Sequence, residues 1–118
     1  ALPASLAPIE IDWLTSPLDL DLRGMNGERY TFHCPAGKAQ QSRVVGSGPY
    51  TDASSICAAA VHAGALRARD GGDVVIEIRP GAQRYAGSER HYLRSKDEDE
   101  GWSGSFVVIG GDAASTKP

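Results

Sequence analysis

Residues 51–64 read TDASSICAAAVHAG, and this stretch predicts the helix around which the rest of the chain folds. Asp52, or Thr51 beside it, can accept hydrogen bonds from the free backbone N–H groups at a helix start. The alanines that follow are the strongest helix formers. Gly64 can adopt the left-handed conformation that ends a helix, and His62 lies in the last turn, where a positive charge is favoured. These signals predict a helix of about three turns.

The predicted helix lacks a polar face. From Ile56 to Val61 every residue is apolar and small. A surface helix carries one apolar stripe, whereas a helix that is apolar on all sides is enclosed by other parts of the protein. Small side chains also let the neighbouring backbone come close. The stretch therefore predicts a central helix wrapped by strands.

The composition predicts a single domain with many turns. The chain has 118 residues, enough for one core, and its 14 glycines and 7 prolines indicate short strands joined by turns. The net charge of −3 gives no basic footprint, so we expect no nucleic-acid partner. No apolar run approaches the length that spans a membrane, and we expect a monomer that does not cross one.

The first residues predict an exported protein. The chain begins with Ala1 and not with methionine, as at a mature end left by signal-peptide cleavage. We therefore expect a secreted or periplasmic location.

Alternation of apolar and polar residues predicts the strands. The clearest is 74–79, in which Val74, Ile76 and Ile78 face one way. Asn26-Gly27 predicts a turn that joins strands 18–23 and 29–33 into a hairpin. Further short strands are expected at 9–13, 40–45, within 85–93 and at 105–109. The acidic run 97–100 is expected to be a solvated loop.

The helix stretch also fits a longer pattern. From Ser55 to Gly64 it matches Ser-Ile-Cys-x-Ala-Ala-x-His-x-Gly without a gap. The segments Cys34-Pro35-Ala36-Gly37 and Tyr85-Ala86-Gly87-Ser88, with Trp102, continue the same order. With these parts the chain resembles the LCCL domain, an extracellular module. The resemblance covers about residues 28–110, which leaves 1–27 as an N-terminal extension packing on the domain and 111–118 as a flexible tail.

The resemblance implies an α+β fold with antiparallel β-sheets wrapped around one central buried helix. The family is regarded as a non-catalytic recognition module, and bacterial surface lipids or glycans have been proposed as ligands for some members. No cofactor is implied. The motif residues are expected to be structural; they are Ser55, Ile56, His62, Gly64, Gly87 and Ser88.

The cysteines depart from the animal members of the family. Those members carry four cysteines in two bridges, whereas Leu18 (or a neighbour) and Lys38 stand here where two of them would be. The reduced set suggests a bacterial member. The remaining Cys34 and Cys57 each match a cysteine whose partner is missing, so we predict that they pair with each other. A zinc site with His33 and His62 is the alternative, but no paired metal-ligand spacing supports it, and we predict no metal.

Basic and aromatic residues gather in one strand-turn-strand region, and they predict a binding face for an anionic glycan or lipid. Arginine binds phosphate or carboxylate with two hydrogen bonds, and aromatic rings stack on sugars. The alternative is a set of ordinary solvated arginines. The candidate residues are Arg79, Arg84, Tyr85, Arg90, His91, Tyr92 and Arg94.

Two other functions compete with such a binding module. The first is a hydrolase that uses His62 with a serine and an acid; Ser103 lies in the nearest likeness to a nucleophile elbow, which lacks the final glycine. The second is a secreted inhibitor or immunity-type domain that binds a partner protein. A large flat apolar patch, involving residues 9–14, would favour the second function.

Overall fold

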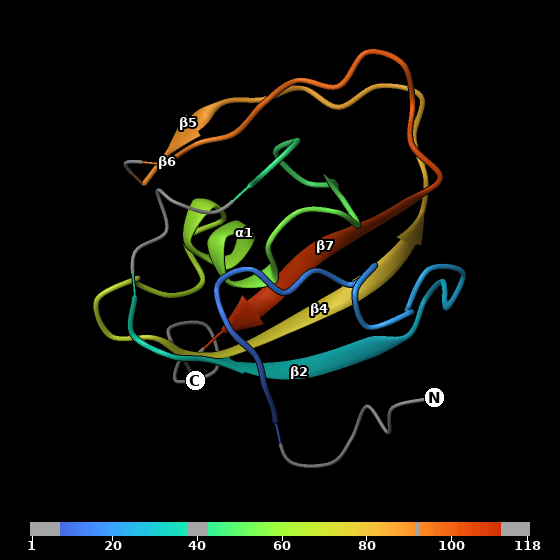
Figure 1. Ribbon diagram of the computed structural model, residues 1–118. Coiled ribbons are helices and arrows are strands. Elements are labelled where there is room, and N and C mark those ends of the chain that lie inside the picture. The colour runs from blue at the N-terminus through green and yellow to red at the C-terminus, as the bar shows by residue number, and fades with distance from the viewer. Residues whose placement is uncertain (1–7, 38–42, 92, 112–118) are drawn as a thin grey trace.

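The structure is a computed structural model that describes residues 8–37, 43–91 and 93–111. A five-stranded sheet with the order β1-β2-β4-β7-β3 and a two-stranded sheet of β5 and β6 enclose helix α1, which lies between them (Figure 1). The predicted α+β fold around a central helix is confirmed. The elements are β1 (Ile9–Glu10), β2 (Arg29–Cys34), β3 (Tyr50–Thr51), α1 (Ile56–His62), β4 (Gly72–Pro80), β5 (Glu89–Arg90), β6 (Leu93–Arg94) and β7 (Gly104–Gly111).

Strand β4 forms the middle of the large sheet. It pairs antiparallel with β2 on one side and with β7 on the other, as its length and alternation predict. Its Val74, Ile76 and Ile78 are buried in the same core as the residues of α1, and the residues between them point to the opposite face of the sheet. Only the edge pair β1–β2 is parallel among the described strands, so the sheet is mixed.

Helix α1 is shorter than predicted and begins later. It has seven residues, about two turns, and its N-cap is Ser55, whose Oγ accepts a hydrogen bond from the Ala58 N–H at 3.1 Å. The prediction of Asp52 or Thr51 as the cap is wrong because Asp52 binds side chains from distant segments instead. Gly64 follows the C-cap with φ of +86°, as predicted for the end of the helix.

The helix is buried on every side. Ile56, Cys57 and the three alanines after them have no exposed surface. Such tight enclosure leaves no space for a larger side chain. At the three alanine positions, a larger hydrophobic side chain would therefore have to displace its neighbours.

We expect the substitution Ala59→Leu to lower the free energy of unfolding by about 1–3 kcal/mol, because the added atoms displace the surrounding backbone. The matched control is Ala63→Leu, at the exposed C-cap. Urea unfolding of both variants and the parent measures the change in the free energy of unfolding. Equal midpoints for Ala59→Leu and the parent would contradict the tight packing.

The prediction of a strand at 18–23, and of its hairpin with 29–33, is wrong. Residues 17–21 form turns in which the Pro17 carbonyl accepts hydrogen bonds from the N–H groups of Leu20 and Leu22. Asp21 has φ of +60°, outside the extended region. The alternating leucines therefore do not share a face, since Leu22 is buried and Leu18 is exposed. The strand predicted at 9–13 is reduced to Ile9–Glu10.

Residues 8–27 nevertheless contact the rest of the domain. The Trp13 Nε1–H donates to the Pro35 carbonyl at 2.9 Å, and the Ile56 N–H at the start of α1 donates to the Thr15 carbonyl at 3.0 Å. Part of the strand predicted at 40–45, and most of the predicted tail at 111–118, lie outside the described residues. In the part of the chain that the structure describes, no helix is long and apolar enough to cross a membrane.

Candidate functional site

His62 ends α1 and is fully buried. Its Nε2 lies 3.0 Å from the Ser88 carbonyl oxygen and its Nδ1 lies 3.0 Å from the Tyr50 hydroxyl. A carbonyl oxygen can only accept, so Nε2 carries the proton and Nδ1 accepts from Tyr50. Burial raises the pKa of Tyr50 to about 12, which keeps its hydroxyl protonated. Burial also lowers the pKa of His62, so the ring is neutral at pH 7 and adds no positive charge at the helix end.

This geometry bears directly on the hydrolase alternative. The Ser88 Oγ lies 3.4 Å from His62 Nε2, slightly longer than the distance of about 2.6–3.2 Å between a nucleophile and its base. A general base must accept the serine proton at that nitrogen, yet Nε2 is already protonated and directed at a carbonyl. No acid orients the other nitrogen, because Tyr50 occupies it. The pair connects the helix to the 87–88 loop and does not activate Ser88.

A polar cleft of 260 Å³ lies beside Ser88. Its walls are held by local hydrogen bonds: the Gly87 N–H donates to Asp97 Oδ1 at 2.6 Å, and the Ser88 N–H donates to Ser95 Oγ at 2.9 Å. Across β5 and β6, Arg94 forms an ion pair with Glu89 at 3.2 Å. The lining residues are Gly87, Ser88, Glu89, Arg94, Ser95 and Asp97.

Gly87 is required at this cleft by close approach of the backbone. A Cβ at this position would lie 2.5 Å from the Ser95 carbonyl oxygen. The Gly87-Ser88 pair therefore lets the loop of residues 87–88 lie flat against Ser95 while the Ser88 carbonyl binds His62.

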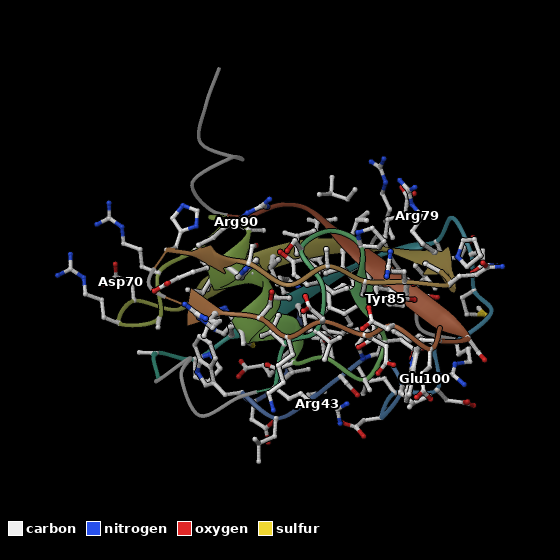
Figure 2. The ribbon with its side chains drawn as sticks, turned by 90° about the horizontal axis from the view of Figure 1, so that it is seen from above. Arg43, Asp70, Arg79, Tyr85, Arg90 and Glu100 are labelled. Carbon is white, nitrogen blue, oxygen red and sulfur yellow. A yellow bond between two sulfur atoms is a disulfide. The ribbon has the colours of Figure 1, made fainter. Side chains whose placement is uncertain are left out.

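The residues of the predicted arginine face do not lie together on one surface. Arg94 lines the cleft, and Arg90 donates to the Ser47 carbonyl at 3.2 Å. His91 packs over Gly64, with its Nδ1 at 2.9 Å from the His62 carbonyl oxygen. Arg84 is exposed and lies 3.4 Å from Asp99. Figure 2 shows Arg79 and Arg90 at well-separated points on the surface.

Two of the predicted aromatic residues do not form part of a described surface. Tyr85 is only 2% exposed, and its hydroxyl bonds the Ala82 N–H and the Ser105 Oγ, so its ring cannot stack on a ligand. Tyr92 lies outside the described residues. Tyr85 was grouped with the arginines because it lies near them in the sequence, and this proximity carries no information about which side chains of the region are buried.

Sequence reasoning missed three of the cleft residues, Glu89, Ser95 and Asp97. Asp97 belongs to the acidic run that predicted a solvated loop, and its side chain is exposed as expected. Its carboxylate also accepts a hydrogen bond from the Gly87 N–H. Asp97 lies ten residues after Gly87, and no local sequence pattern signals this contact. Within the described residues, no group of three or more metal-ligating side chains lies close enough to hold a metal ion.

The predicted disulfide is confirmed. Cys34 and Cys57 are bonded, with their Cα atoms 5.8 Å apart. Cys34 is the last residue of β2, and Cys57 lies in the first turn of α1. The bond therefore joins the sheet directly to the central helix.

Comparison with known proteins places the chain in a family. The LCCL domain model matches residues 11–106, beginning well before residue 28. Human cochlin is 33% identical over 109 residues, which cover 92% of this chain and 18% of cochlin. Mouse vitrin is 35% identical over 80 residues, covering 67% of the chain and 12% of vitrin. The human protein named cysteine-rich secretory protein LCCL domain-containing 2 is 38% identical over 69 residues, which cover 55% of this chain and 14% of that protein. The chain thus spans less than a fifth of these relatives' length, and it belongs to the LCCL domain family.

Proposed function

We propose that this domain is a non-enzymatic recognition module that binds a sugar unit of an anionic surface glycan in the cleft beside Ser88. The observation that carries the proposal is the chemistry of the cleft lining. Hydroxyl groups, one guanidinium and two carboxylates line it, and these groups donate to and accept from a polyhydroxylated ring. Pockets for apolar ligands are lined mainly by hydrophobic side chains, so this cleft suits a sugar or a headgroup better than an acyl chain.

The size of the cleft limits the ligand. Its 260 Å³ lies just below the range of about 300–1,000 Å³ that is usual for small-molecule sites. One ring of a longer glycan fits such a space, with the neighbouring rings outside. Arg90 lies on the same hairpin as Arg94 and supplies a second positive charge for an acidic substituent.

The other two functions have less support. The protonated Nε2 and complete burial of His62 argue against hydrolysis by Ser88. An inhibitor or immunity-type surface at residues 9–14 is weakened because Ile9, Ile11 and Trp13 pack against the core, while Leu14 alone of these apolar residues is largely exposed. Export agrees with the disulfide, since disulfides persist in oxidising compartments outside the cell or in a periplasm.

We expect Arg94→Glu to weaken binding of lipopolysaccharide, and of its delipidated polysaccharide, by about tenfold. A hydrogen bond to a charged group contributes about 1.5–3 kcal/mol, and 1.4 kcal/mol corresponds to tenfold in affinity. Isothermal titration calorimetry measures the affinity of the protein for both ligands. The matched control is Arg69→Glu, an equally exposed arginine that pairs with Asp70 away from the cleft.

Equal affinity of the parent and Arg94→Glu for the delipidated polysaccharide would exclude the cleft as the sugar site. Binding of intact lipopolysaccharide alone would point to the acyl chains and contradict the proposed ligand class.

A further inference from the structure

Two arginines and a glutamate form a charged cluster on the sheet face that points away from α1. Arg29 on β2 lies directly opposite Glu77 on β4, and Arg79 follows Glu77 two residues along the same strand. Because residues two apart on a strand share a face, all three side chains point away from the core. Their neighbours Tyr30, Ile76 and Ile78 are buried on the other face.

The carboxylate of Glu77 forms ion pairs with both Arg29 and Arg79. The Arg29 Nε lies 2.9 Å from Glu77 Oε1, and the Arg79 Nε lies 2.6 Å from Glu77 Oε2. Glu77 is only 14% exposed in its side chain, whereas Arg29 and Arg79 are 59% and 48% exposed. The hydrogen bond from Arg29, followed by the charge of Arg79, outweighs desolvation and holds the pKa of Glu77 below its usual value. The glutamate is therefore ionised, and the cluster keeps one net positive charge.

The contacts use one nitrogen of each guanidinium. Among the described residues, no hydrogen bond involves an Nη group of Arg29 or Arg79. A guanidinium has five N–H donors, and those on its outer edge match two oxygens of a phosphate or sulfate. Glu77 thus restrains two arginine side chains that would otherwise lose rotamer freedom on binding a ligand.

We propose that Arg29 and Arg79, positioned by Glu77, form a second anion site that binds the tetrahedral oxyanion of a phosphate or sulfate ester. The site is separate from the cleft: it lies on β2 and β4, whereas the cleft lies on the β5–β6 hairpin. It does not depend on the function proposed above. Its ligand chemistry is a doubly hydrogen-bonded anion and not a sugar ring.

The test is a titration with inorganic phosphate at constant ionic strength, followed through the backbone amide and arginine Nε–H signals in nuclear magnetic resonance spectra. We expect saturable shifts at Arg29 and Arg79, and a dissociation constant about tenfold larger in Arg29→Gln or Arg79→Gln. Arg69→Gln removes the same charge elsewhere and should leave binding unchanged. Shifts that do not saturate, or that saturate in Arg79→Gln with the dissociation constant of the parent, overturn the proposal.

The substitution Glu77→Ala separates a positioned site from simple charge attraction. It removes a negative charge, so charge attraction alone predicts tighter phosphate binding. A site that depends on positioning predicts weaker binding. Weaker binding with an otherwise unchanged spectrum supports the proposal, and tighter binding overturns it.

A comparison of two sugar esters shows whether the site prefers a phosphate or a sulfate group. Glucose 6-phosphate and glucose 6-sulfate are compared with unmodified glucose on the parent protein. Binding of either ester above that of glucose supports the site and names the ester, and no difference from glucose contradicts it. The cleft variant Arg94→Glu should keep this binding, so failure of one site is distinguishable from failure of the other.

Discussion

Replacing Cys34 and Cys57 together by alanine should lower the free energy of unfolding by about 3 kcal/mol. The disulfide closes a loop with a sequence separation of 23 residues, and in the chain-entropy model a loop of this length contributes about that amount. Both residues are fully buried, so the lost packing of the sulfur atoms adds to the effect. For a domain of this size, 3 kcal/mol is a large share of the total stability of about 5–15 kcal/mol.

Urea unfolding of the double variant, beside the oxidised and the reduced parent, measures this effect. The reduced parent should approach the double variant, because both lack the bond between β2 and α1. Cysteines that react with an alkylating reagent in the unreduced parent, or a double variant as stable as the oxidised parent, would contradict the role of the disulfide.

The substitution Asp52→Ala should lower the free energy of unfolding by about 1.5–3 kcal/mol, because it removes the charged acceptor of several hydrogen bonds, although the partner Arg23 is 37% exposed in its side chain. Asp52 is 1% exposed and accepts two hydrogen bonds from Arg23, both at 2.8 Å. It accepts a third from Trp102 Nε1 at 2.6 Å, while Arg23 lies over the indole ring. Removing the carboxylate leaves the indole N–H and the guanidinium without their acceptor.

The same residue sets an acid dependence. Burial by itself raises the pKa of Asp52, but the hydrogen bonds from Arg23 and Trp102 outweigh it and hold the pKa below its ordinary value of 3.8. The carboxylate therefore adds stability that is fully present well above pH 3.8 and is lost as the pH falls through the folded-state pKa. Thermal unfolding between about pH 6 and pH 2 should show this loss in the parent and a flatter curve in Asp52→Ala.

Asp99→Ala is the matched control, because it removes a carboxylate from an exposed ion pair with Arg84. Its effect on stability should stay within about 0.5 kcal/mol. An Asp52→Ala variant as stable as this control would show that the buried cluster contributes nothing.

The features predicted correctly from the sequence were those encoded by neighbouring residues. The run of alanines identified the helix and its burial, and the alternation in 74–79 identified the middle strand. The family resemblance added the Cys34–Cys57 pair. The position of the helix start was missed because Asp52 and Ser55 are both good caps, and only distant contacts to Asp52 decide between them.

The errors arise where distant contacts decide the structure. Trp102 lies 50 residues from Asp52, so no local pattern connects them. The leucines of 18–22 alternate as in a strand, but the turns at Pro17 and the positive φ of Asp21 place them on different sides. Of the residues that line the cleft, Arg94 was named as a ligand-binding candidate and Gly87-Ser88 as structural, while burial of Tyr85 could be known only from the folded chain.

The strand order of the large sheet determines when the domain can fold during synthesis. Strand β7, near the end of the chain, lies between β4 and β3, which are made earlier. Until residues 104–111 have left the ribosome or crossed a membrane, β3 has no partner in the sheet and α1 has only part of its cover. Between the synthesis of residues 56–62 and that of residues 104–111, the emerging chain therefore carries an incompletely covered apolar helix, which is the kind of surface that chaperones bind. Folding of the domain is completed by its last strand.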